Sequence, residues 1–137
     1  MTAVRLARAT VIVCLFAAAV EVALGCASTA GLAPGDAIVA LFVVGPYLLL
    51  ASLAWRLRAR ATASRALLAV AVGLSAWGLA TFGWHGYRYH AEPQYRALQN
   101  MALFSVPLLQ WVAVLLVGLA SLLVRPGSRG ERPTGDA

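Results

Sequence analysis

The stretch MALFSVPLLQWVAVLLVGLASLLV, residues 101–124, contains no charged side chain. A helix needs about 20 apolar residues to cross the hydrocarbon core of a bilayer, which is roughly 30 Å thick. The stretch ends at Arg125 and Pro126, a charged residue and one that cannot continue a helix. Residues 101–124 therefore predict a membrane-spanning helix.

Three further apolar runs precede this one. The expected spans are residues 9–29, 38–55, 66–84 and 100–124. Glycines and prolines separate the first two runs, an arginine-rich segment separates the next two, and none shows the two-residue alternation of a barrel strand. Because lipid offers no partner to unpaired backbone groups, the sequence predicts an all-α integral membrane protein, a four-helix transmembrane bundle.

The composition leaves room for one membrane domain and little else. The chain has 137 residues, of which 61% are hydrophobic and 12% charged, and its mean hydropathy is +0.80. A soluble domain carries about 25% charged residues. We expect residues 1–126 to form a single transmembrane domain and residues 127–137 to form a disordered cytoplasmic tail.

The arginines predict the orientation of the bundle. The formal net charge is +6, but the arginines lie at the ends of apolar runs, so we expect the lipid bilayer and no nucleic acid as partner. Loops rich in arginine face the cytoplasm, which places both termini there. The absence of lysine indicates a GC-rich genome and hence a bacterial inner membrane. The arginines expected on the cytoplasmic side are Arg5, Arg8, Arg56, Arg58, Arg60, Arg65, Arg125, Arg129 and Arg132.

The first apolar run also fits a second interpretation. Arg5 and Arg8 precede it, and the small residues Ser28 and Ala30 follow it, as in a cleaved signal peptide. Glu21 interrupts the apolar part of this run, which is unusual for a signal peptide. Cleavage would leave three spans instead of four.

Four polar side chains are expected near the centre of the bilayer: Glu21, Tyr47, Ser75 and Gln110. An acidic residue at mid-membrane costs about 2.5–3.5 kcal/mol on insertion scales, so Glu21 requires a reason. It can be a neutral acid that joins helices by hydrogen bonds to Tyr47 or Gln110. Glu21 can also be a proton or cation site. A third possibility is that Glu21 lies closer to the outer interface than to the centre of the bilayer.

Two functions follow from these interpretations of Glu21. The preferred one is a structural or accessory subunit of a membrane complex, and the alternative is a small ion-coupled transporter with Glu21 as the protonatable site. Residues 17–25 resemble the segment around the glutamate of the small multidrug resistance exporters. The one-sided arginines, the proline positions and the long outer loop depart from that family. An inhibitory or immunity-type membrane protein is a third option that no residue favours.

Small residues predict where helices pack. In lipid, small side chains allow backbones to approach closely, so we expect stripes of them to face a neighbouring helix, a membrane-protein partner or a second copy of the chain. One stripe is Ala66, Ala69, Gly73, Ala76, Ala80 and Gly83; the other is Thr10, Cys14, Ala17, Glu21, Gly25 and Ser28.

Two prolines interrupt the expected helices. Pro46 and Pro107 each remove a backbone donor and free the carbonyl four residues earlier, those of Phe42 and Leu103. We expect a kink at each proline.

The segment after the third run is rich in aromatic residues. We interpret Trp84, Tyr87, Arg88, Tyr89 and Tyr95 as an interfacial belt or as a partner surface. Pro93 suits the first position of a helix, so we expect the fourth helix to begin there and to project from the membrane.

Nothing in the sequence predicts an enzyme, a cofactor or a metal site. There is no phosphate-binding glycine loop, nucleophile elbow or cluster of metal ligands. Cys14 and Cys26 are about 18 Å apart if one helix carries both, too far for a disulfide. His85 and His90 are the only histidines and point to different faces of a helix.

Overall fold

The computed structural model describes residues 2–27, 34–94 and 99–123. These residues form four helices and no strand: α1 (Ala3–Ala27), α2 (Pro34–Arg56), α3 (Ala61–Ala91) and α4 (Gln99–Leu123). All four are long and apolar enough to cross a membrane. The predicted all-α membrane bundle is therefore confirmed. Residues 28, 29 and 124 of the expected spans lie outside the described residues.

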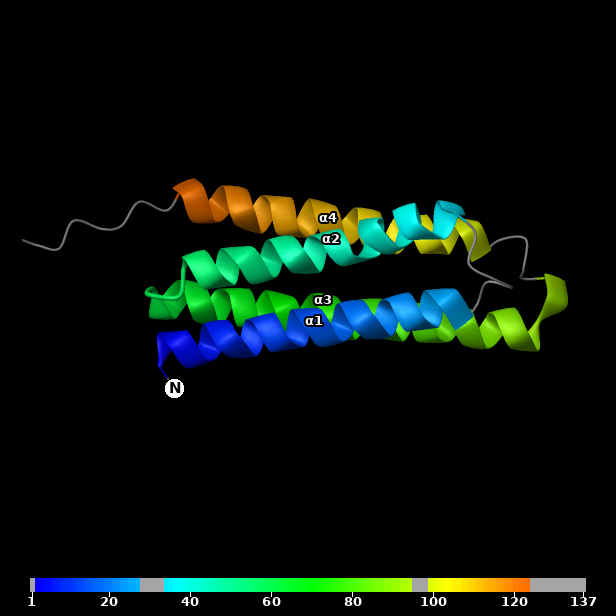
Figure 1. The fold of residues 1–137 in the computed structure, drawn as a ribbon, viewed down its shortest axis with the longest axis horizontal. Helices are drawn as coiled ribbons and strands as arrows, with labels where there is room; N and C mark the ends of the chain where they lie inside the picture. Colours follow the sequence, from blue (N-terminus) through cyan, green and yellow to red (C-terminus); the bar gives the residue numbers. More distant parts are fainter. Residues whose placement is uncertain (1, 28–33, 95–98, 124–137) are drawn as a thin grey trace, which may run out of the picture.

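The helices run alternately in opposite directions along one axis (Figure 1). α1 packs mainly against α3 and α2, while α4 packs against α2 and α3. A short turn joins α2 to α3, and its backbone is hydrogen-bonded: Leu57 N–H donates to Leu53 O, and Arg60 N–H donates to Leu57 O, both at 2.9 Å. Such short turns place consecutive helices antiparallel.

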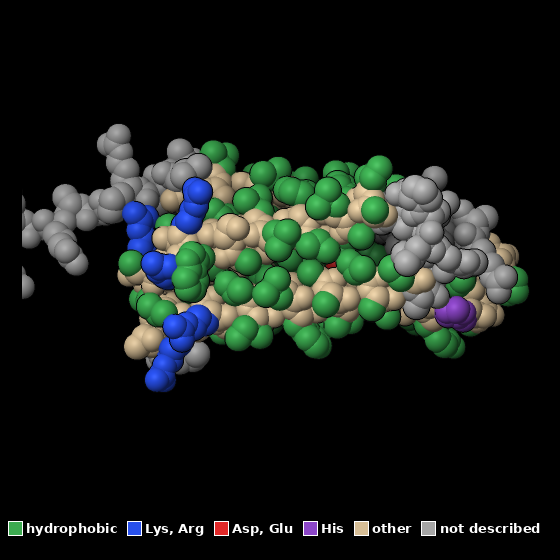
Figure 2. All heavy atoms as spheres, in the orientation of Figure 1, with side chains coloured by type: hydrophobic (Ala, Val, Ile, Leu, Met, Phe, Trp, Pro, Cys, Tyr) green, Lys and Arg blue, Asp and Glu red, His purple; other side chains and the backbone are tan. Residues whose placement is uncertain are grey.

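The described arginines gather at one end of the bundle, with Arg88 as the exception. Figure 2 shows this basic end beside the start of α1 and the α2–α3 turn, and a broad apolar surface over the middle of the molecule. The Arg58 guanidinium lies 4.5 Å from the centre of the Trp55 ring, an arrangement that suits an interface where water meets lipid. Arg96, Arg125, Arg129 and Arg132 lie outside the described residues.

α3 is longer than expected, and the predicted start of α4 is wrong. α3 continues to Ala91, and α4 begins at Gln99 rather than at Pro93. Glu92 is extended (φ −127°, ψ 99°) and Pro93 begins a short 3₁₀ turn. The ring of a proline forces the preceding residue out of the helical region, so Pro93 ends α3 instead of starting α4. Residues 95–98 of the expected helix lie outside the described residues.

The projecting helix is therefore α3. Its 31 residues span about 46 Å at roughly 1.5 Å per residue, more than the hydrocarbon core of about 30 Å. Near its end Arg88 donates hydrogen bonds to Glu92 from Nε at 3.1 Å and from Nη2 at 2.7 Å, and these hydrogen bonds hold the pKa of Glu92 below its ordinary value. Glu92 thus stays charged at neutral pH, as suits a helix end outside lipid.

Five of the six small residues predicted as a stripe on α3 face outward instead of toward another helix of the bundle, and the sixth, Gly83, is half-buried. Ala66, Ala69, Gly73, Ala76 and Ala80 are all exposed, and a Cβ built on Gly73 would meet no atom within 4 Å; we call these five residues the outer α3 face. α3 buries Ser64, Leu67, Ala71, Ser75, Gly78 and Phe82 instead. The exposed set and the buried set both recur at helical spacing. The second set faces inward because it places Ser75 and Gly78 beside the polar groups of the other helices.

Four residues of the stripe predicted for α1 face inward, and a fifth, Gly25, is half-buried. Thr10, Cys14, Ala17 and Glu21 are buried, and the Thr10 hydroxyl donates to Leu6 O at 2.9 Å within the same helix. Residue 28 of this stripe lies outside the described residues. Small side chains along this face let α1 approach α2 and α3 closely.

Trp111 supplies the donor that Pro46 removes from α2. Pro46 lacks the N–H that would bond to Phe42 O, and the Trp111 indole of α4 donates to this carbonyl from Nε1 at 3.0 Å. Gly45 makes room for the ring, since a Cβ there would overlap Cζ2 and lie 3.1 Å from Cη2. Gly45 and Pro46 therefore form the site at which α4 docks on α2. The kinks at Pro46 and at Pro107, which also lies inside its helix, stay predictions.

We predict that Gly45→Ala destabilises the bundle and that Gly73→Ala does not. The new methyl group at residue 45 pushes the Trp111 ring away from Phe42 O, and overpacking of this kind costs about 1–3 kcal/mol. At residue 73 the methyl group meets open space, and alanine is favoured over glycine in a helix by about 0.5–1 kcal/mol. The stability of both variants is measured as the free energy of unfolding in mixed detergent micelles. Equal losses of this free energy in the two variants would show that Gly45 is not part of a docking site.

Candidate functional site

Glu21 is buried in the middle of the bundle. It lies on the inward face of α1, where the preceding turns carry Cys14, Ala17 and Ala18, and its exposed fraction is 0%. A carboxyl group removed from all solvent must be paired, hydrogen-bonded or neutral. The partners of Glu21 therefore define the site.

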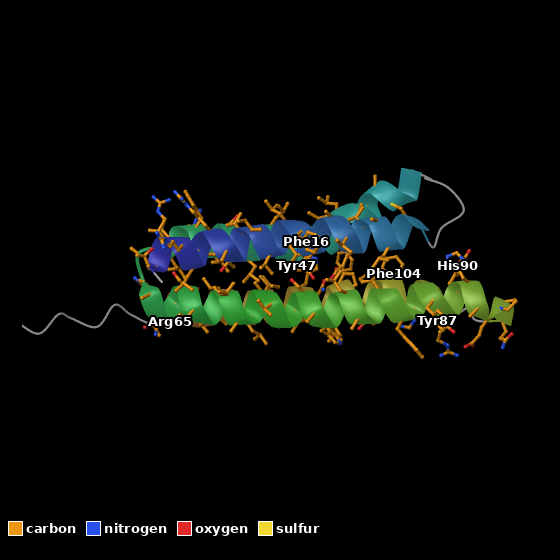
Figure 3. All side chains as sticks on the ribbon, turned by 90° about the horizontal axis from the view of Figure 1, so that it is seen from below. Phe16, Tyr47, Arg65, Tyr87, His90 and Phe104 are labelled. Carbon is orange, nitrogen blue, oxygen red and sulfur yellow. The ribbon has the colours of Figure 1, made fainter. Side chains whose placement is uncertain are left out.

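Glu21 is hydrogen-bonded to two other helices. Tyr47 of α2 donates from its hydroxyl to Glu21 Oε1 at 2.5 Å. Gln110 of α4 donates from Nε2 to Oε1 and Oε2 of Glu21 at 3.3 and 3.5 Å, and to the Tyr47 hydroxyl at 3.0 Å. All three side chains are fully buried, and Figure 3 shows Tyr47 between the helices near the middle of the bundle. We call Glu21, Tyr47 and Gln110 the polar layer.

α3 covers the polar layer with Gly78 and Ser75. A Cβ built on Gly78 would overlap Glu21 Oε1 and would lie 2.6 Å from Gln110 Nε2, so only glycine lets the backbone of α3 come this close. Ser75, one turn earlier, lies beside the Tyr47 hydroxyl, and its Oγ is buried without a hydrogen-bond partner. All four helices thus contribute to the site.

Apolar side chains seal the polar layer along the bundle axis. On the side of the basic end it is followed by Leu50, Ala71 and Val114, and on the opposite side by Val43, Phe82 and Val106; these six residues belong to two buried apolar clusters. The apolar clusters separate the carboxyl group from both ends of the bundle. In such surroundings electrostatic and hydrogen-bonding energies are larger than in water.

Within the described helices, no cationic side chain neutralises Glu21. Among the described residues the one ion pair joins Arg88 to Glu92, and no group of three or more His, Cys, Asp or Glu side chains could hold a metal ion. Cys14 is a buried thiol on the same helix as Glu21. The chemistry available at the site is hydrogen bonding and proton binding.

The structure brings together three of the four polar residues predicted from the sequence and leaves the fourth at their edge. Glu21, Tyr47 and Gln110 bond to one another, whereas Ser75 lies beside Tyr47 without a hydrogen bond. The belt residues Trp84, Tyr87, Arg88 and Tyr89 lie on the projecting end of α3, and Tyr95 lies outside the described residues.

The sequence reasoning missed Gly78 and Trp111. Gly78 was overlooked because the small residues at 73, 76 and 80 formed a more regular stripe on the opposite face. A signal for Trp111 did exist, since the carbonyl freed by Pro46 needs a donor at the same depth, and the indole next to Gln110 is such a donor.

Comparison with known proteins assigns no family. No protein-family model matches the chain, and neither a curated protein nor a solved structure matches it. The polar layer and the outer surfaces of the helices are therefore the features that bear on function.

We predict that Glu21→Gln preserves the bundle and that Glu21→Leu weakens it. Glutamine keeps an acceptor for Tyr47 and Gln110, whereas leucine removes the hydrogen bonds of both to α1 and leaves them only the one they make with each other. Polar contacts between membrane helices contribute about 0.6–2 kcal/mol, so the leucine variant should lose that amount of unfolding free energy. If both variants unfold alike in mixed micelles, the hydrogen bonds do not hold the helices together.

Proposed function

We propose that this chain is a structural or accessory subunit of a membrane complex, on which a transmembrane helix of another protein docks. The observation that carries the proposal is the outer α3 face. Its five small residues have no partner within the described bundle, and Gly73 opens onto free space.

The outer α3 face differs from the outward faces of the other helices. Lipid tails are as apolar as leucine, so a face that meets only lipid has no need of small residues. The outward faces of α1, α2 and α4 carry large side chains, among them Ile12, Leu15, Phe16, Leu41, Leu48, Leu108, Leu115 and Leu116. On α3 the exposed large side chains Val72 and Trp77 lie beside the alanines and Gly73, whose small side chains would let a second backbone approach closely.

The spacing within the outer α3 face fits a neighbouring helix. Residues 66, 69, 73, 76 and 80 alternate steps of three and four, an average of 3.5 residues. This repeat keeps a seam in register with a helix that crosses at about +20°. A partner helix in this position would bury a face that the bundle itself leaves open.

The polar layer supports a structural role over ion-coupled transport. Its three members are fully buried, and Gly78 is pressed against the carboxyl group. A substrate would have to separate α3 from the other helices to reach Glu21. In the described state the layer acts as a tie between helices.

The proposed subunit lies in a bacterial inner membrane with both termini in the cytoplasm. The support is the cluster of arginines at the end where α1 begins and α2 turns into α3 (Figure 2), since arginine-rich ends stay on the cytoplasmic side. The projecting end of α3, with Trp84 and Tyr87, then faces outward.

Affinity purification of the tagged full chain in mild detergent tests the docking surface. We predict that a different membrane protein co-purifies in a fixed ratio and that Gly73→Leu abolishes its recovery. The leucine extends into open space, so the bundle should keep its unfolding free energy. Leu115→Phe, which enlarges a lipid-facing residue of α4, is the matched control and should retain the partner.

Two results would contradict the proposal. Recovery of the chain alone, as a monomer, would leave the outer α3 face without a partner. Recovery of a homo-oligomer that Gly73→Leu dissociates would show that the face binds a second copy, and the accessory role would be wrong.

We predict from the arginine distribution that a reporter inserted in the α2–α3 turn, after Arg58, is on the cytoplasmic side. A reporter after Gln94 should be on the outer side, because an odd number of spans separates the two positions. Enzyme reporters active on only one side of the membrane give the answer. An external signal from the turn would invert the proposed orientation.

A further inference from the structure

The hydrogen bonds that join Glu21 to α2 and α4 do not explain how the charge of its buried carboxyl group is neutralised. An ionised carboxylate in an apolar interior costs many kcal/mol unless a positive charge compensates it, and such groups are usually neutralised instead. A basic side chain, a metal ion or a proton could neutralise Glu21. The described residues place no basic side chain against it.

The packing around Glu21 favours a proton over a metal ion. A bound metal ion needs several oxygen ligands and a cavity to hold it. Here the polar atoms contact one another directly, with Tyr47 at 2.5 Å from the carboxyl oxygen. Gly78 leaves no room even for a methyl group. A proton needs no cavity.

The hydrogen-bond partners of Tyr47 show where such a proton would be held. As placed, Tyr47 donates to Glu21, and Ser75 Oγ lies beside the Tyr47 hydroxyl, close enough to interact with it. Two buried oxygens, Ser75 Oγ and Gln110 Oε1, are left outside hydrogen-bonding geometry in this arrangement. A buried hydroxyl that makes no hydrogen bond is destabilising, because it has lost its hydrogen bonds to water. The cost disappears if the Tyr47 hydroxyl turns toward Ser75 and accepts a hydrogen bond from Glu21 in return.

We propose that Glu21 is a proton-binding site: its carboxyl group carries one proton in the folded protein, donates it to the Tyr47 oxygen, and Tyr47 in turn donates to Ser75 Oγ. Gln110 Nε2 continues to donate to the second carboxyl oxygen. Binding adds one proton to the carboxylate and breaks no covalent bond. The proposal is independent of the docking of a partner on the outer α3 face.

The described side chains around Glu21 are uncharged hydrogen-bond partners, so hydrogen bonds rather than neighbouring charges determine whether its carboxyl group is protonated. The titratable groups that face the site are Tyr47 of α2 and Cys14, two turns earlier on α1. Gly78 and Ser75 of α3 and Gln110 of α4 do not titrate. A tyrosine and a cysteine in model peptides are neutral at pH 7, so no neighbouring charge compensates an ionised Glu21.

Infrared spectroscopy of the full chain in lipid vesicles tests the proposal. A protonated carboxyl group absorbs at a higher wavenumber than a carboxylate. Of the other four acids, Asp36 and Glu92 lie outside the candidate spans, and Glu131 and Asp136 follow the last apolar run in the sequence. We expect one protonated carboxyl band at pH 7. Glu21→Gln should abolish this band, and Glu92→Gln, at an exposed glutamate, should leave it intact.

Further variants test the hydrogen-bond chain. Tyr47→Phe removes the acceptor of the Glu21 proton and should shift the band to higher wavenumber. Ser75→Ala should also move the band, whereas Ser52→Ala, whose hydroxyl bonds Leu48 O on the exposed side of α2, should not.

Three results would overturn the proposal. One is the absence of a protonated band at pH 7, and another is a band that survives Glu21→Gln. The third is loss of the band when sodium chloride replaces choline chloride at constant pH, because a metal cation would then occupy the site in place of a proton.

Discussion

The arrangement of the four helices depends on how one carboxyl group is kept inside them. Glu21 is fully buried at the level where α2 and α4 bring Tyr47 and Gln110. A bilayer supplies no hydrophobic force between helices, so the contacts that join them must be close packing and hydrogen bonds. The carboxyl group makes hydrogen bonds to two helices at once, and the apolar clusters on either side keep it from water.

Two glycines make the polar contacts possible at this depth. Gly78 lets the backbone of α3 lie against Glu21, and Gly45 lets the Trp111 ring reach the carbonyl that Pro46 leaves free. In each case a missing side chain on one helix admits a polar group from another. Gly73 has no such neighbour and faces open space, so it takes no part in the contacts inside the bundle.

Much of the fold could be predicted from the sequence, because apolar length and arginine position act locally along the chain. The spans and the inward face of α1 followed from these signals. The side of α3 that turns inward did not, since alanines at helical spacing suit a buried seam and an external one equally well. Pro93 was ambiguous for a similar reason: proline can start a helix or force the end of the preceding one. The partners of Glu21 could be predicted from their depth in the bilayer alone. The role of Gly78 could not, because it depends on how α3 packs against the other helices.

The central claim is that Glu21 and Tyr47 are energetically coupled across α1 and α2. A double-mutant cycle of Glu21→Leu and Tyr47→Phe, measured as unfolding free energies in mixed micelles, tests it most directly. The structure predicts a coupling energy of about 0.6–1.7 kcal/mol, the range found for hydrogen bonds between membrane helices. A coupling energy no larger than that of a control cycle of Glu21→Leu with Ser52→Ala would contradict the claim.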